Sequence, residues 1–396
     1  MVVKAAPARI KTLHALAQMQ QDYVVRVRRD LHKIPELGWH ETKTLQYIKN
    51  EIAKLLPLLV YDARLVELEG GIYLDIDVNP DAERFLFRAD IDGLPIQEQT
   101  GLPFSSEHEG LMHACGHDCH AAMLLGFLRS VASGFEPTQN LRLVWQRAEE
   151  IITSQSGGAR LVEEGICDGI TKAFGLHVST PHENGVFFSR SGPMLANAAH
   201  LFIEIKCTGG HVMRPDFGSN AIDIVTEIQV AMRSFAQLTL GSSAPINFVP
   251  SQSNAGRIFN VMPDKAELWF SIRNFLEPRE LRLFLCKLRA KIESIVSSFK
   301  DGKVNAFEFY QGFPVCANDQ ACKESVEKIL HSHGFETQET EQLYAGEDFA
   351  FYTEHCISSF WMLGVKQGPG HDHHTPLFNP EESKLWQGVA FWLALA

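Results

Sequence analysis

The sequence predicts an α/β protein: a larger domain with a central mixed sheet flanked by helices, and a smaller inserted α/β domain. Two observations lead to this fold class. Amphipathic helical segments alternate with short apolar runs through most of the chain, which is typical of α/β sheets. A separate strand–helix–strand–strand–helix series interrupts that alternation. A chain of 396 residues is also long enough to build more than one core.

The first part of the larger domain is expected over residues 1–192. Two amphipathic helices are predicted, at residues 10–31 and 42–56, on either side of the helix-breaking sequence PELG at 35–38. The elements that follow alternate between strand and helix, and they are predicted at residues 72–78, 84–88, 121–131, 141–145 and 174–178.

The inserted domain is expected over residues 193–306. Its predicted strands and helices lie, in βαββα order, at residues 200–207, 221–240, 246–249, 266–272 and 280–298. Helix–strand alternation then returns over residues 307–396 and ends in a helix at 380–393. The larger domain is therefore expected to consist of two separate chain segments.

Composition excludes several classes of protein. The net charge is -12 and no basic block occurs, which argues against a nucleic-acid partner. No apolar run approaches the ~18–20 residues of a membrane span, and residues 1–20 lack the apolar centre of a secretion signal. The eight cysteines form no regular framework, as is typical of reduced thiols. We therefore expect a cytoplasmic protein.

The 17 histidines gather in a few short segments, and residues 112–120 (MHACGHDCH) are the densest of them. Three His, two Cys and one Asp stand there just before a predicted helix, which gives metal ligands a rigid support. A structural zinc site is the alternative, but such sites pair two close cysteines with a second ligand pair at short spacing. No second pair follows, so the segment predicts a functional metal site.

Further candidates follow the predicted strands. Glu149 and Glu150 come after the strand at 141–145, at the edge where open α/β sheets place their sites. One of them can bind metal while the other moves a proton, a division of roles that suits amide hydrolysis. His177 lies in an apolar strand, where a packed core histidine is the alternative. The segment 370–378 (GHDHHTPLF) holds three more histidines, and the sequence does not say which of them binds metal.

The inserted domain adds three candidates. A glycine pair precedes His211, which lets its imidazole approach a ligand closely. Asn260 supplies an amide. Arg273 supplies a guanidinium that can hold a carboxylate through two hydrogen bonds, although a structural ion pair is the more common role of a single arginine.

Taken in this order, the segments resemble the M20 metallopeptidase/aminoacylase family. The resemblance is closest to its amidohydrolase branch of hippurate hydrolases, auxin-conjugate hydrolases and N-acetyl-diaminopimelate deacetylases, and it covers nearly the whole chain. The segments that carry it are 29–37 (RDLHKIPEL), 88–95 (RADIDGLP), 115–118 (CGHD), 149–150 (EE), 175–177 (GLH), 346–349 (GEDF) and 374–376 (HTP).

The resemblance implies a site for two divalent metal ions (Mn, Zn, Ni or Co). The ligands that it implies are Cys115, His117, Glu150, His177 and His374. It further implies Glu149 as general base, His211 as the group that stabilises the oxyanion, and Asn260 and Arg273 as substrate contacts. The inserted domain would be a lid through which two subunits form a homodimer.

The function expected from the residues and the resemblance is metal-dependent hydrolysis of a small N-acyl amino acid or conjugate, releasing a carboxylic acid and a free amino acid. A dipeptidase or carboxypeptidase of the same family is one alternative. A non-catalytic metal-binding regulator is another, against which the presence of Glu149 argues. A redox protein using Cys115 and Cys119 is disfavoured by their C-x3-C spacing.

The sequence departs from the branch at a few positions. Arg147 stands where proline is usual, residues 151–156 form a longer segment, and Asp216 replaces the histidine that usually follows proline. None of these changes removes an implied ligand or the base. We expect them to affect substrate preference.

Overall fold

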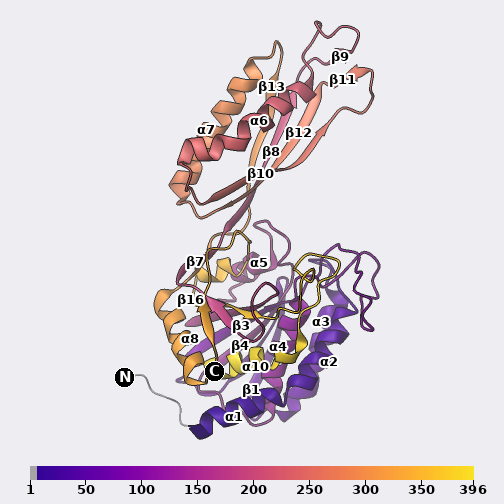
Figure 1. Cartoon of the computed structure of the whole chain (residues 1–396). Coiled ribbons are helices and arrows are strands. Elements are labelled where there is room, and N and C mark those ends of the chain that lie inside the picture. Colours follow the sequence, from indigo (N-terminus) through magenta and orange to yellow (C-terminus); the bar gives the residue numbers. More distant parts are fainter. Residues whose placement is uncertain (1–6) are drawn as a thin grey trace. The chain divides into compact units, whose positions relative to one another are not determined.

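The computed structural model describes residues 7–396 and forms two compact units (Figure 1). The large unit comprises Met1–Met194, Cys316–Gln342 and Asp348–Ala396, of which residues 1–6 lie outside the described part. The small unit comprises Leu195–Val315 and Leu343–Glu347. The domain limits expected at residues 192 and 306 stay predictions. Strand β13 (Lys303–Gln311) runs across the second limit.

A mixed eight-stranded sheet forms the centre of the large unit, in the order β1-β2-β4-β3-β5-β16-β6-β15. The strands are β1 (Asp62–Leu68), β2 (Gly71–Asp77), β4 (Asn140–Gln146), β3 (Arg84–Asp90), β5 (Lys172–Ser179), β16 (Ile357–Gly364), β6 (Phe187–Ser189) and β15 (Thr337–Glu339). The four neighbours β4, β3, β5 and β16 are parallel to one another. Their carboxyl ends therefore meet at one edge of the sheet, where open α/β sheets place ligands.

Helices cover this sheet (Figure 1). They are α1 (Pro7–Gln18), α2 (Gln21–His32), α3 (Thr42–Leu55), α4 (His117–Ala132), α5 (Gly157–Glu163), α8 (Gln320–Ser332), α9 (Ala350–Thr353) and α10 (Trp386–Leu395). Helix α4 is buried on all sides, since it packs against α2, α3, α10 and β3, and its apolar sequence fits that position. It holds the end of the histidine- and cysteine-rich segment 112–120 on a rigid support.

The prediction of one helix over residues 10–31 was wrong, because the segment forms two helices, α1 and α2. The chain turns at Met19 and Gln20, and the buried Gln20 side chain accepts a hydrogen bond from Arg129 Nη1 (2.9 Å). Both helices pack on α4, so apolar residues recur on each side of the turn and the periodicity does not reveal it.

The small unit is a four-stranded antiparallel sheet in the order β10-β12-β8-β13, which packs against α6 and α7 (Figure 1). The elements are β8 (Asn197–Lys206), α6 (Ala221–Leu240), β10 (Ile246–Ala255), β12 (Lys265–Asn274), α7 (Pro278–Ser297) and β13. Residues alternate between buried and less buried along β12, as expected for a sheet with one covered face. The predicted βαββα order is present, and β13 completes the sheet.

Short strands complete the fold. In the small unit, β9 (Gly210–His211) pairs with β11 (Val261–Met262). Strand β7 (Gly192–Leu195) pairs with β14 (Cys316–Asn318). The α/β fold class predicted from the sequence, with a larger mixed-sheet domain and an inserted α/β domain, is confirmed.

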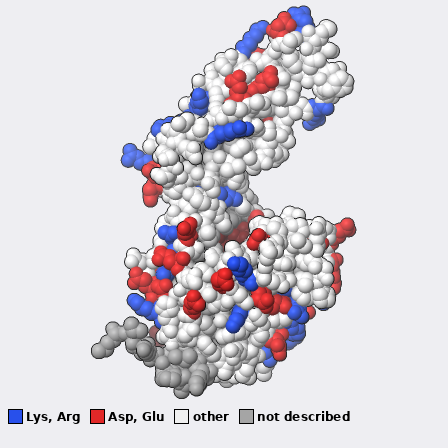
Figure 2. Space-filling model, viewed as in Figure 1, with Lys and Arg blue, Asp and Glu red and all other residues white. Residues whose placement is uncertain are grey.

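The surface in view carries basic and acidic side chains interspersed (Figure 2). Within the described residues, no helix combines the length and apolar character needed to cross a membrane. All eight cysteines are free thiols.

Candidate metal centre

Several predicted site residues of the large unit converge at the carboxyl edge of its parallel strands. Glu149 and Glu150 follow β4, His177 lies near the end of β5, and Cys115 and His117 stand at the start of α4. Gly116 makes the entry into α4 possible. Its φ of 97° is left-handed, and a Cβ at this position would overlap the Val178 side chain.

One group of ligand atoms gathers around the Cys115 thiol. Its Sγ lies 3.3 Å from His374 Nε2 and 3.5 Å from His177 Nε2. His374 Nε2 also lies 3.2 Å from Glu150 Oε1. Among the three histidines of the C-terminal run, His374 is therefore the candidate that contacts this thiol. His371 Nδ1 instead lies 2.8 Å from the Leu377 carbonyl oxygen, and His373 Nε2 accepts from the Thr180 backbone N–H (3.1 Å).

His117 has the arrangement expected of a metal-ligating histidine. Its Nδ1 lies 3.0 Å from both Oδ1 and the backbone oxygen of Asp92, which places the proton on Nδ1. The opposite atom, Nε2, is buried and has no hydrogen-bond partner, with Asp90 Oδ2 at 3.6 Å and Glu149 Oε2 at 3.9 Å. Burial disfavours the imidazolium, but Asp90 and Asp92 outweigh it and raise the pKa of His117 to about 10. The pocket thus favours a positive charge at this position.

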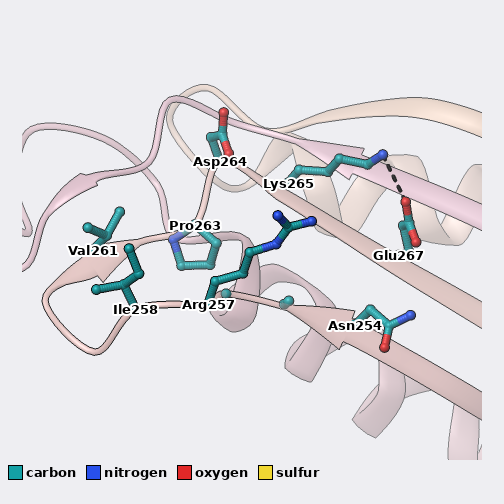
Figure 3. Close-up of a pocket in the computed structure, with 10 residues that line it drawn as sticks. Asn254, Arg257, Ile258, Val261, Pro263, Asp264, Lys265 and Glu267 are labelled. Atoms are coloured by element: carbon teal, nitrogen blue, oxygen red, sulfur yellow. Dashed lines mark ion pairs between the residues drawn. The ribbon is translucent and has the colours of Figure 1, made fainter.

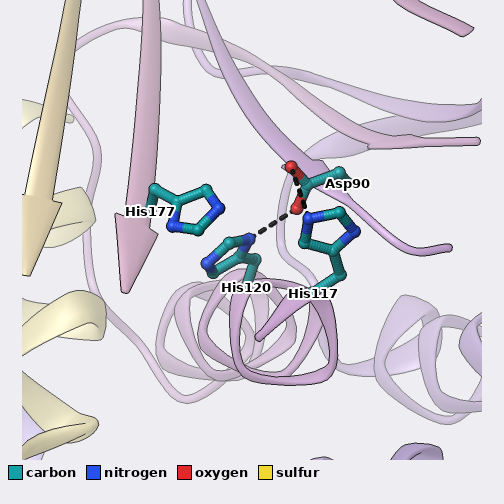
Figure 4. A group of neighbouring side chains, drawn as sticks. All are labelled: Asp90, His117, His120 and His177. Carbon is teal, nitrogen blue, oxygen red and sulfur yellow. Dashed lines mark hydrogen bonds and ion pairs between the residues drawn. The ribbon is translucent and has the colours of Figure 1, made fainter. Parts of the chain in front are cut away.

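Asp90 and His120 also belong to this cluster, and sequence reasoning did not select them (Figure 4). His120 Nδ1 donates to Asp90 Oδ1 at 2.5 Å, and its Nε2 accepts from the Val178 backbone N–H at 2.9 Å. Both ring nitrogens are therefore engaged, so His120 supports the cluster and does not fit a ligand role. The available signal was its place in the HDCH run, one helical turn after His117.

A buried polar network extends from Asp90 to Glu149. Arg88 donates to Asp90 Oδ2 (2.8 Å) and to Asp348 Oδ1 (2.6 Å), so one guanidinium serves two buried carboxylates. Gln146 Nε2 also donates to Asp348 (2.8 Å). The backbone N–H of Asp348 in turn donates to Glu149 Oε1 (3.4 Å). The network thereby fixes the carboxylate that was predicted to act as general base.

A second carboxylate, that of Glu41, stabilises the turn that carries Glu149. Glu41 accepts from the Ala148 backbone N–H (2.7 Å) and from Arg147 Nε (3.0 Å), and Arg147 Nη2 donates to the Trp39 carbonyl oxygen (2.7 Å). Arg147, the departure from the family pattern, therefore stabilises this turn through an ion pair. Ala148 itself has a φ of 52°, an uncommon left-handed conformation for a residue with a side chain.

The negative charge of the cluster favours the binding of a cation. The carboxylates of Asp90, Glu149 and Glu150 crowd one buried volume together with Cys115. Burial, and then Glu150 and Glu149, raise the pKa of the Cys115 thiol well above its usual range. A thiolate can therefore form here only when a positive charge balances it, which divalent metal ions supply.

The other predicted residues lie in the small unit. His211, on β9, is exposed and accepts at Nδ1 from the Met213 backbone N–H (3.1 Å). Asn260 lies beside it, since its carbonyl oxygen accepts from the Val212 N–H (3.4 Å). Arg273 is not brought to these two: it lies at the opposite end of β12, half-buried, and burial lowers its pKa.

A pocket of about 450 Å³ also lies in the small unit (Figure 3). Arg257 and the Lys265–Glu267 ion pair (2.8 Å) line it, and His211, Asn260 and Arg273 do not. It contains no histidine or cysteine, so it does not have the chemistry of the metal cluster.

Residues 86–396 match the peptidase family M20/M25/M40. The chain is 31% identical to N-acetyl-L-cysteine deacetylase of Bacillus subtilis, over 93% of this chain and 86% of that protein. It is 30% identical to thermostable carboxypeptidase 1 of Saccharolobus solfataricus, over 95% of each. A solved Bacillus subtilis dinuclear metal-binding peptidase of the M20 family aligns with a TM-score of 0.78 and 26% identity, over 97% of this chain and 98% of that one.

The chain belongs to the peptidase family M20/M25/M40. The family resemblance drawn from the sequence is confirmed. A metal-binding role for the cluster agrees with the dinuclear relative and with the grouping of His, Cys, Asp and Glu side chains in this chain.

Proposed function

We propose that the protein hydrolyses the amide bond of a small N-acyl amino acid or amino-acid conjugate, releasing a carboxylic acid and a free amino acid. The observation that carries the proposal is the convergence of Cys115, Glu150 and three imidazoles beside Glu149, a further carboxylate held by its own network. Membership of the family and the similarity to a deacetylase support it.

In this proposal two divalent ions bind to the five residues inferred from the sequence, which are Cys115, His117, Glu150, His177 and His374. When bound, the ions polarise the scissile carbonyl and make water more acidic. The backbone contacts of His117 and His177 leave Nε2 of each ring directed into the cluster. The thiolate favours Zn, Ni or Co, whereas the family resemblance favours Mn.

Glu149 is the proposed general base and acid. Its Oε1 accepts from the Asp348 N–H, which leaves Oε2 on the side of His117 (3.9 Å from Nε2). A carboxylate held in this way can take a proton from the attacking water and deliver it to the leaving amine. This role requires that Glu149 binds no metal itself.

The small unit supplies the proposed substrate contacts. The family resemblance assigns these roles: His211 stabilises the oxyanion, and Asn260 and Arg273 bind the substrate, Arg273 through the amino-acid carboxylate. Arg273 lies at the other end of β12 from His211 and Asn260, so the geometry of the small unit alone does not join the three. Strand β10, at the edge of the small-unit sheet, carries no charged residue, and its backbone on either side of the bulge at Pro250 is open to pairing with a second copy. We propose a homodimer through this unit, which sedimentation analysis of the Val249→Lys variant tests. The cytoplasmic location stays a prediction.

The experiment measures amine release from N-acetyl, N-benzoyl and indole-acyl amino acids, with dipeptides and a longer peptide as the competing class. The protein is first reconstituted with Mn, Zn, Co or Ni. Chelator-sensitive turnover of an N-acyl amino acid supports the proposal. Preference for removing the last residue of a peptide favours the carboxypeptidase alternative, which the Saccharolobus relative supports. Tight metal binding without turnover of any substrate favours the regulator.

A further inference from the structure

Arg273 projects from the face of the small-unit sheet that lies opposite α6 and α7. Along β12, Leu268, Phe270 and Ile272 pack into the core with these helices, so the alternate residues of the strand point to the other face. The half-buried Arg273 guanidinium donates to the Ile272 carbonyl oxygen (3.3 Å) and forms no ion pair with any carboxylate of the described chain. A charge that is partly removed from water without a counter-ion is costly, so this guanidinium is suited to bind an anion.

An imidazole lies beside Arg273 on the same face. Strand β8 pairs with β12 in a register that places Ala198 opposite Arg273 and His200 opposite Ser271. His200 is therefore the diagonal neighbour of Arg273 in the sheet, at roughly 7–8 Å. Burial, and then the charge of Arg273, lower the pKa of His200. The imidazole next to the guanidinium is therefore neutral at pH 7 and belongs to the aromatic part of this face.

His200 is one of four aromatic rings that contact one another here. Tyr310, on β13, lies opposite His200, and their ring centroids are 6.1 Å apart. Trp269 stacks with Tyr310 (5.9 Å, with 23° between the planes) and also contacts Phe202 (4.8 Å). The Tyr310 side chain is 41% exposed, and the other three are half-buried. These rings, which we call the aromatic face, leave a surface against which a further aromatic ring can pack.

We infer that the aromatic face is the side-chain subsite of the substrate, and that the preferred substrates are N-acyl derivatives of aromatic amino acids. The inference rests on the proposed function, in which Arg273 binds the amino-acid carboxylate. In an N-acyl amino acid the carboxylate and the side chain leave the same carbon atom. A surface next to Arg273 therefore contacts the side chain, whereas the acyl group lies beyond the amide. An aromatic side chain gains contacts with these rings that a methyl group cannot make.

The test compares kcat/KM for N-acetyl-L-phenylalanine and N-acetyl-L-alanine, using the metal-loaded full-length protein. The phenylalanine derivative should be preferred by ~10-fold or more, the scale on which an apolar pocket discriminates. Trp269→Ala should bring this ratio close to one by lowering kcat/KM for the phenylalanine derivative alone. Arg273→Gln should lower kcat/KM for both compounds. Leu238→Ala is the matched control, because it removes an exposed apolar side chain from α6 and should keep the ratio.

Tyr310→Ala changes the most exposed of the four rings and makes the same prediction, should circular dichroism show that Trp269→Ala does not fold. If neither compound is hydrolysed, the proposed function fails, and calorimetric titration of the two compounds then decides the subsite by the ratio of their affinities.

The inference is overturned if the unmodified protein treats the two compounds alike, or if the ratio is unchanged in both ring variants. A change in sedimentation with an unchanged ratio also overturns it, since the aromatic face would then be an interface between copies of the chain.

Discussion

The change Asp92→Ala tests how the metal cluster is built. One oxygen of this carboxylate lies 3.0 Å from His117 Nδ1, and the other accepts from the Glu150 backbone N–H at 2.9 Å. A single side chain therefore orients two of the proposed ligands. Its removal leaves His117 with the backbone oxygen of residue 92, also at 3.0 Å, but leaves the Glu150 N–H without this acceptor.

The contacts of Asp92 determine how much metal affinity the variant is expected to lose. Loss of a carboxylate that supports a metal ligand typically weakens metal binding 10–100-fold. Because His117 keeps the backbone oxygen, we expect a loss toward the lower end, about 10-fold, or ~1.4 kcal/mol at 25 °C. Asp92→Asn should lose about as much, since one amide oxygen cannot accept from both His117 and Glu150.

The assay is competition between the protein and a chromophoric chelator for Zn²⁺. Asp372→Ala is the control: it removes an equal charge from an exposed position near His374 and should not change the affinity. Circular dichroism checks that each variant is folded. If Asp92→Ala binds Zn²⁺ as tightly as the control, Asp92 does not orient ligands, and the assignment of His117 loses its main support.

Three further predictions follow from other contacts. Glu149→Ala should keep its metal content and lose turnover by ~10²-fold or more, the scale of general acid–base catalysis; unchanged turnover would exclude Glu149 as the base. Cys115→Ser should bind less metal on elemental analysis, because a hydroxyl is a poor substitute for a thiolate; a full complement would mean that another residue is the ligand. Hydrogen bonds from the backbone N–H groups of Ser219 and Thr208 lower the pKa of Asp301 to about 2, from 3.8 in an unfolded chain. This carboxylate therefore stabilises the fold above pH ~4, by less than ~1 kcal/mol in its half-exposed position, and the contribution is lost as the pH falls toward 2. Asp301→Asn should flatten the pH dependence of thermal unfolding in that range, and an identical pH profile would contradict the reasoning.

Hydrophobic periodicity was sufficient to predict the bounds of an element whose apolar face is continuous from end to end. Helix α6 has the predicted bounds of 221–240, because its apolar face is continuous and Asn220 caps its start. The predicted helix at 121–131 begins four residues earlier, at His117, because the polar residues 117–120 form its first turn. A chemically specialised helix end lacks the apolar pattern that marks the rest of the helix.

The pairing of strands that lie far apart in the sequence could not be predicted from local sequence patterns. Strand β13 joins the small-unit sheet by pairing with β8, about a hundred residues earlier, and nothing within 303–311 shows that partner. In the same way, Asp90 and His120 are drawn into the cluster by contacts across the sheet and α4. Side-chain hydrogen bonds between distant segments decide such roles, and they exist only in the folded chain.

The candidate ligands were found from the sequence because metal sites need unusual residue types close together. The choice among the three C-terminal histidines needed the fold, since only the structure shows His374 Nε2 facing the Cys115 sulfur. Arg147 was seen as a departure from the family pattern, and its contact with Glu41 became visible only in three dimensions.

The central claim is that the protein is a metal-dependent amidohydrolase, and its most direct test measures how turnover depends on the number of bound metal ions. Chelator-treated protein is titrated with Mn²⁺ or Zn²⁺ while bound metal and amine release are measured in the same samples. The account predicts that turnover of an N-acyl amino acid is absent without metal and reaches its maximum when two ions are bound per chain. The number two agrees with the dinuclear metal-binding relative. Full turnover in protein that binds no metal would contradict it.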